Sequence, residues 1–197
     1  MRMLPMVGLM VGLMMHAGSV AAQAQTKTAA KAPAKAAAAR FTLSSPDVKN
    51  GTFQAAQLMN GMGCTGGNTS PHLVWSGAPA GTKSFVLTMY DPDAPTGSGW
   101  WHWVVANIPA TATELPAGAS GKANLLKGAV ETHNDMGQSA YMGPCPPPGP
   151  AHRYLLTLYA LKVDKIDVPA EASGAFVGFN NKANALASAT LTVKYGR

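Results

Sequence analysis

Residues 84 to 109, "SFVLTMYDPDAPTGSGWWHWVVANIP", decide the fold class of this chain. Two apolar runs of strand length, rich in valine, threonine and aromatic residues, flank a loop of proline, glycine and aspartate. Short apolar runs that alternate with such loops are typical of an all-β sandwich or barrel. The stretch also gathers Asp91, Asp93 and His102, although only 12% of the chain is charged. Binding pockets combine apolar walls with a few polar groups, so the same stretch is a candidate site.

The same pattern continues along the chain from Phe41 onward. Several of its apolar segments are continuous runs, as expected for strands that are buried on both faces. A helix is expected around Glu171–Lys182, where Ala172, Phe176 and Phe179 fall at helical spacing. The predicted fold class is therefore all-β, a sandwich or barrel with one or two short helices. The segments expected to form strands are "FTLSS" (41–45), "HLVWSG" (72–77), "SFVLTMYD" (84–91), "HWVVANIP" (102–109), "RYLLTLYALK" (153–162) and "ATLTVKYG" (189–196).

The first 24 residues predict a secretory signal peptide. They begin with a cationic Arg2, continue with an apolar run, and end in the small-residue pattern "AQA". The run is short for a membrane span, and no cysteine lies near the cleavage point to carry a lipid, so we expect export in soluble form rather than an anchor. Residues 25–40 are mostly Ala and Lys and offer no large apolar side chain to bury, which predicts a flexible tail. The folded domain is then expected over residues 41–197, in the periplasm or outside the cell.

The charge of the chain is concentrated before the predicted domain. The whole sequence has 15 Lys and Arg against 9 Asp and Glu, a formal net charge of +6. Residues 1–40 hold five of the cationic residues and none of the acidic ones, which leaves 10 minus 9, or +1, for residues 41–197. Nucleic-acid binding depends on neutralising phosphates across a basic face. A nucleic-acid partner is therefore not expected.

The two cysteines, Cys64 and Cys145, both lie in the predicted domain. On an exported chain they are expected to form a disulfide, with two buried free thiols as the alternative. A metal site built on them would need further ligands at suitable spacing, and none lies beside either cysteine.

The two aspartates of the first motif stand at the end of an expected strand. Residues at positions i and i+2 of an extended segment point to the same side, so Asp91 and Asp93 can face one pocket. Pro92 and Pro95 restrict the backbone around them. The alternative is that each aspartate only caps the local turn.

Two histidines occupy similar positions at junctions between loops and strands. His102 begins a buried strand in "WWHWVV", and His152 begins another, two residues before Tyr154 and therefore on the same side. A hydrogen-bonded core histidine is the alternative reading for His102. His72 and His133 stand alone in loops and are expected to have no part in a site.

These motifs, read together, resemble a known family. The segments "DPDAP", "WWHW", "GPCPPPG" and "HRY", in this order, are similar to those of the phosphatidylethanolamine-binding protein family, in its bacterial Raf-kinase-inhibitor-like branch. The resemblance runs from about Phe41 to Arg197, and four short motifs in order are far more specific than any one of them. It implies a sandwich of antiparallel sheets with a small anion-binding cavity at one end. The cavity residues implied are Asp91, Asp93, Pro95, Trp100, His102, Gly143, Pro146, His152 and Tyr154.

The chain departs from the eukaryotic members at two places. Cys145 interrupts the cavity loop "GPCPPPG", which makes the assignment of Pro146 less direct than that of His152. No counterpart of the carboxy-terminal helix of animal members follows "LTVKYGR". The ligand preference of those members is therefore not carried over.

The residue chemistry agrees with an anion site. Imidazole N–H groups, a tyrosine hydroxyl and loop amides such as that of Gly143 are donors suited to phosphate or carboxylate. An aspartate beside an imidazole can favour its charged form, or can accept a proton from a phosphomonoester. As the resemblance implies, the predicted function is an exported, non-enzymatic binding protein for a phosphate-type anion or a zwitterionic phospholipid head group, with no cofactor.

Two other functions remain as alternatives. A hydrolase could use Asp91 or His152 as a general base, although no "GxSxG" nucleophile motif occurs. A metal-dependent enzyme could use Asp91, His102 and His152 as ligands, since two histidines and one carboxylate are a known ligand pattern. Some members of the family that this chain resembles inhibit a kinase or a protease. The resemblance therefore implies that binding to a protein partner is a further possible function.

Overall fold

The computed structural model describes residues 40–121 and 125–197. The predicted signal peptide, residues 1–24, and the predicted tail, except for Arg40, lie outside the described residues. Among the described residues, no helix is long and apolar enough to cross a membrane.

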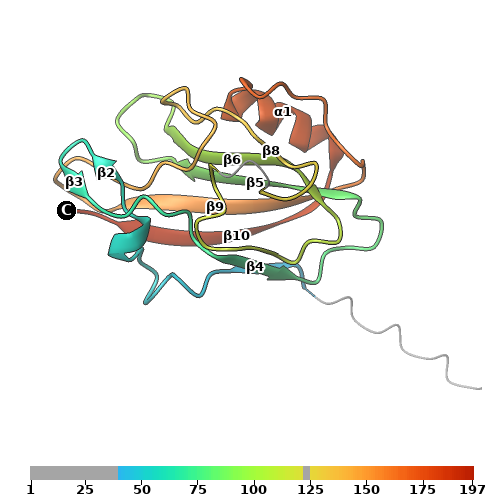
Figure 1. Ribbon diagram of the computed structural model, residues 1–197, viewed down its shortest axis with the longest axis horizontal. Helices are drawn as coiled ribbons and strands as arrows, with labels where there is room; N and C mark the ends of the chain where they lie inside the picture. The colour runs from blue at the N-terminus through green and yellow to red at the C-terminus, as the bar shows by residue number, and fades with distance from the viewer. Residues whose placement is uncertain (1–39, 122–124) are drawn as a thin grey trace, which may run out of the picture. The chain divides into compact units, whose positions relative to one another are not determined.

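Two antiparallel sheets form the domain, as predicted (Figure 1). The larger sheet has the strand order β10-β9-β5-β6-β8 and the smaller one β1-β4-β7, while β2 and β3 pair as a separate hairpin. The large sheet consists of β5 (Ser84–Asp91), β6 (Trp100–Pro109), β8 (Val130–Glu131), β9 (His152–Leu161) and β10 (Ala185–Tyr195). The remaining elements are β1 (Thr42–Ser44), η1 (Ala55–Gln57), β2 (Asn60–Gly61), β3 (Cys64–Thr65), β4 (Leu73–Ser76), β7 (Glu114–Leu115) and α1 (Gly174–Asn184).

The large sheet is covered on both faces, which explains the continuous apolar runs. Successive strand residues point to opposite faces, and in β5 Leu87 belongs to the core between the two sheets whereas Val86 belongs to a second cluster. That second cluster includes Val177 of α1. Figure 1 shows α1 and β4 on opposite sides of the large sheet.

The helix forms close to the predicted place but presents a different face. It begins at Gly174, after the cap residue Ser173, whose hydroxyl accepts the Phe176 N–H at 3.2 Å. Phe176 and Phe179, two of the residues at helical spacing, are 48% and 77% exposed, whereas Val177 is buried. The spacing therefore predicted the helix but not the side chain that it buries, and a close contact lies at the start of the helix.

That contact joins Gly174 to the ring of Trp101. A Cβ at Gly174 would overlap the Trp101 indole, so only glycine lets the helix start this close to the sheet. Ala172, the third residue of the expected apolar face, is buried ahead of the helix. The two phenylalanines are left on the outer side.

The strand register brings four chain segments to one end of the large sheet. Asp91, the last residue of β5, pairs with Trp100, the first residue of β6. The partner of His152, the first residue of β9, is Tyr195 at the end of β10. Since β9 also pairs with β5, the loops that follow β5 and precede β9 meet at this end. The candidate site lies there.

Candidate functional site

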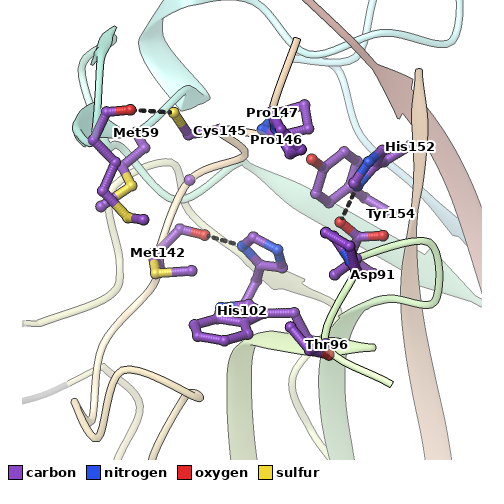
Figure 2. A pocket seen from close by; sticks show the side chains of 15 residues that line it. Met59, Asp91, Thr96, His102, Met142, Cys145, Pro146, Pro147, His152 and Tyr154 are labelled. Carbon is purple, nitrogen blue, oxygen red and sulfur yellow. Dashed lines mark hydrogen bonds and ion pairs between the residues drawn. The ribbon is translucent and has the colours of Figure 1, made fainter. Parts of the chain in front are cut away.

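A cavity of about 160 Å³ opens at this end of the sheet (Figure 2). Figure 2 shows Asp91, His152 and Tyr154 on one side of it and His102 with Met142 on the other. Eight of the nine residues expected for the site line the cavity, the exception being Asp93. The eight are Asp91, Pro95, Trp100, His102, Gly143, Pro146, His152 and Tyr154.

Asp91 forms the polar base of the cavity with His152. Both side chains are buried, and the Asp91 Oδ2 lies 2.7 Å from the His152 Nδ1. The other carboxylate oxygen, Oδ1, accepts the Asp93 N–H at 2.8 Å. Asp91 therefore both caps its turn and orients an imidazole, so the two interpretations of this residue hold together.

Asp93 does not face the cavity, and the expectation that both acids share one pocket was wrong. It is an exposed residue that binds Arg153, accepting from the backbone N–H at 2.8 Å, from Nε at 2.9 Å and from a terminal guanidinium nitrogen at 2.7 Å. These hydrogen bonds hold the pKa of Asp93 well below its ordinary value. The rule for positions i and i+2 failed because the chain turns after Asp91 and is no longer extended at Asp93.

His102 crosses the cavity from the start of β6. Its Nδ1–H donates to the Met142 carbonyl at 2.9 Å, and its ring packs edge-on against Tyr154 with centroids 5.2 Å apart. Burial lowers the pKa of His102 from 6.5 to about 4, although the Met142 carbonyl and Asp91 oppose this. The effect of burial thus exceeds that of Asp91 at His102, and its imidazole is neutral at neutral pH.

Two buried donors on residues that line the cavity lack a hydrogen-bond partner within the described part of the chain. They are the Tyr154 hydroxyl and the Trp100 Nε1–H. Burial raises the pKa of Tyr154 well above its ordinary value, with Asp91 adding to the effect, so the hydroxyl keeps its proton. Buried polar groups are nearly always paired in folded proteins, and an unpaired one calls for an explanation.

Gly143 belongs to the cavity wall for a different reason from the one expected. Its N–H donates to the Asn68 side chain at 2.8 Å and is not free for an anion, which corrects the expected role of this loop amide. A Cβ at Gly143 would overlap the backbone of Gln57 and Met59. The glycine thus allows the cavity loop to lie directly against the segment after η1.

A disulfide at Cys145 also holds this loop in place. The sulfur atoms of Cys64 and Cys145 are bonded, with Cα atoms 6.0 Å apart and a sequence separation of 81. Arg197 adds a second fastening, since its Nε donates to the Pro146 carbonyl at 2.6 Å and one terminal nitrogen to the Gly63 carbonyl at 3.1 Å. The loop that carries Pro146 is therefore held to the β2–β3 hairpin by covalent and polar contacts.

Several cavity residues were not found from the sequence. Three methionines, Met59, Met62 and Met142, and the polar Thr96 complete much of the wall. Met62 is 68% exposed, an unusual degree for an apolar side chain next to a cavity. The only signal in the sequence was the position of the first two in "LMNGMGC", beside Cys64, since the disulfide carries this segment to the cavity loop.

The other two described histidines, His72 and His133, lie away from the cavity. His72 Nε2 is 2.8 Å from the Glu114 carboxylate, so His72 is paired rather than isolated, and its backbone N–H donates to Asp47. The backbone N–H of His133 donates to the Ala172 carbonyl. Within residues 40–121 and 125–197, no three His, Cys, Asp or Glu side chains are grouped so that they could hold a metal ion.

Together, fold and site define a class of protein: an antiparallel β-sandwich with a small cavity at the strand ends, built on a buried aspartate–histidine pair. The chain belongs to the phosphatidylethanolamine-binding protein family, whose sequence profile matches residues 44–196. The resemblance seen in the four motifs is thereby confirmed.

Individual relatives agree with this assignment. The chain is 51% identical to YbcL of Escherichia coli over 164 residues, which cover 81% of this chain and 90% of YbcL, and 51% identical to YbhB of the same organism over 78% of this chain and 98% of YbhB. Both are named UPF0098 proteins. A crystal structure of E. coli YbcL, described as a new member of the mammalian family, superposes with a TM-score of 0.77 over 80% of this chain and 98% of that one, at 48% identity. The protein is thus a family member of the UPF0098 type.

Proposed function

We propose that the protein is an exported, non-enzymatic binding protein whose cavity takes a small phosphate-type or zwitterionic head group. The observation that carries the proposal is a pair of buried donors on residues that line one cavity, the Tyr154 hydroxyl and the Trp100 Nε1–H, which have no partner among the described residues. An acceptor-rich ligand such as phosphate would give both donors a partner.

The size of the cavity limits what can enter it. Pockets for drug-sized ligands usually measure ~300–1,000 Å³, against about 160 Å³ here. A head group would fit, whereas the chains of a lipid would have to extend past the opening. Exposed Met62 and Pro147 border the cavity and could contact such an apolar substituent.

Two observations support export. A disulfide between Cys64 and Cys145 is stable in an oxidising compartment and rare in a reducing one. A Mycobacterium tuberculosis relative, LppC, is named as a candidate lipoprotein and is 34% identical over 70% of this chain and 63% of its own length. Amino-terminal sequencing of the mature protein from a periplasmic or culture fraction should give a start near residue 25. Recovery of the uncleaved chain from the cytoplasm alone would contradict export.

The test of binding is calorimetric titration of inorganic phosphate and of phosphorylethanolamine into the mature protein. We expect saturable binding at one site. The affinity of Tyr154→Phe should be roughly ten- to a hundredfold lower than that of the wild type, because a hydrogen bond to a charged group is worth ~1.5–3 kcal/mol. His72→Ala is the matched control, since His72 lies away from the cavity beside Glu114, and it should bind as the wild type does. Equal binding by Tyr154→Phe and the wild type would contradict the proposal.

A further inference from the structure

The cavity offers hydrogen-bond acceptors as well as donors. Asp91 and His102 both line it, one as a carboxylate and the other as a ring. The Met142 carbonyl can only accept, so the proton of the neutral His102 ring is fixed on Nδ1. The second nitrogen, Nε2, is then a bare lone pair, and Figure 2 shows it on the side of the ring away from Met142, toward Tyr154 and Asp91.

The charged and titratable groups around His102 keep this arrangement in place. Those that face it are Asp91, His152 and Tyr154. Asp91 favours a charged ring, His152 opposes it, and burial opposes it more strongly, so the pKa of His102 falls to about 4. Nε2 is therefore an acceptor throughout the neutral range.

The charges of the residues that line the cavity decide how a doubly charged ligand would bind. No lysine or arginine is among the residues that line it, within the described ranges of the chain. Arg153, next to His152 in sequence, is exposed and bound to Asp93. A dianion would therefore stand close to the Asp91 carboxylate and to the Nε2 lone pair of His102, and both contacts are repulsive.

A ligand that still carries a proton avoids both costs. Its O–H can donate to His102 Nε2 or to Asp91, while its other oxygens accept from Tyr154 and Trp100. We propose that the cavity selects a protonated oxyacid: a phosphate or phosphomonoester in its monoanionic form, with one P–O–H, over the dianion. This inference rests on the proposed function and names the charge state of the ligand that the site recognises.

The selection predicts a particular pH dependence. Above the second pKa of the ligand, the monoanion falls tenfold for each pH unit, and the apparent affinity should fall with it. A proton taken up by the protein instead of the ligand would also strengthen anion binding at low pH. The two causes differ in one respect: a ligand proton places the midpoint at the pKa of the ligand, whereas a histidine proton places it at the same pH for every ligand.

The experiment is calorimetric titration of the wild-type protein between pH 5 and 8.5 with three ligands. Inorganic phosphate is the reference, monofluorophosphate has a more acidic second ionisation, and sulfate is a dianion of the same shape. We expect the midpoint for monofluorophosphate to lie below that for phosphate by the difference between their pKa values. We also expect sulfate to bind at least tenfold more weakly than phosphate at pH 6. A common midpoint for the two phosphates, or sulfate binding as tightly as phosphate, would overturn this proposal and leave the proposed function standing. Failure of phosphate to bind at any pH would overturn both.

A variant tests the acceptor directly. His102→Gln replaces the bare nitrogen with an amide that can donate as well as accept. The ratio of phosphate to sulfate affinity at pH 6 should fall toward one, provided that circular dichroism shows the wild-type fold. His72→Gln makes the same change outside the cavity and should leave the ratio unchanged. An unchanged ratio in a folded His102→Gln would contradict the assignment of Nε2, and the wild-type titrations decide the proposal if that variant does not fold.

Discussion

The Tyr154 hydroxyl should lower the stability of the unliganded protein and should increase its affinity for the ligand. It is buried at the start of β9 without a hydrogen-bond partner among the described residues. A buried polar group left unpaired costs ~1–3 kcal/mol. Tyr154→Phe removes only this hydroxyl, so the unliganded variant should be more stable than the wild type by about 1–2 kcal/mol.

The size of the thermal shift follows from the size of the domain. For domains of roughly 150–250 residues, each kcal/mol moves the melting temperature by about 2–4 °C. The variant should therefore melt about 2–8 °C higher without ligand. With phosphate at a hundred times the wild-type dissociation constant, the wild type gains about 2.7 kcal/mol, and a variant that binds ten- to a hundredfold more weakly gains only about 0.4–1.4 kcal/mol. The stability advantage of the variant should thus shrink or reverse.

The assay is thermal unfolding of both proteins, with and without phosphate, followed by circular dichroism. Tyr90→Phe is the control, because the Tyr90 hydroxyl donates to the Ser98 carbonyl at 2.7 Å and its removal relieves no unpaired group. That variant should gain no stability and should keep the full effect of phosphate. A Tyr154→Phe protein that melts below the wild type without ligand, or that phosphate stabilises equally, would refute the reasoning.

Three further predictions use other parts of the structure. Thiol titration of the unfolded, unreduced protein should find no free thiol, and two free thiols per chain would exclude the bridge. Loss of the Cys64–Cys145 bridge, whose cysteines have a sequence separation of 81, should lower the free energy of unfolding by roughly 4 kcal/mol in a chain-entropy model. The pKa of His102 is lowered from 6.5 to about 4 in the folded protein, so the unfolded state binds the proton more readily, and the free energy of unfolding should fall by ~3 kcal/mol as the pH drops from 6.5 to 4. Urea titrations at several pH values should show that His102→Gln lacks this loss. The same pH profile in the variant and the wild type would contradict the prediction. His152→Ala should bind phosphate roughly ten- to a hundredfold more weakly than His72→Ala in parallel calorimetric titrations, and equal affinities would remove His152 from the site.

The sequence predicted the sheets well because their strands are buried on both faces. A run such as "SFVLTMYD" is strongly apolar throughout, and both of its faces contact core clusters. The two-residue strands β2, β3, β7 and β8 were missed, since they are held by pairing with longer strands or with each other rather than by an apolar pattern of their own. The buried face of α1 was also missed, because it depends on the contact of Gly174 with Trp101, two residues far apart in sequence.

Similar limits applied to the candidate site. Asp91, His102, His152 and Tyr154 could be predicted because each lies in a strand near the end that opens into the cavity, where position follows from local pattern. An imidazole beside Asp91 was expected, but the Met142 carbonyl as the partner of His102 could not be predicted. Whether Asp93 meets a ligand or Arg153 depends on a turn and on a neighbouring strand, and such cross-chain contacts leave no local mark in the sequence.

The central claim is that this cavity binds a phosphate-type group. Its most direct test is to follow the indole N–H resonance of Trp100 in ¹H–¹⁵N spectra while phosphate is titrated into the protein at pH 6. The Trp100 Nε1–H has no partner in the described structure, whereas the Trp103 Nε1–H donates to the Glu131 carboxylate at 2.6 Å. We predict a saturable downfield shift of the Trp100 signal as its N–H gains an acceptor, with the Trp103 signal unmoved. A Trp100 resonance that stays in place while phosphate binds, or that follows the Trp103 resonance, would contradict the account.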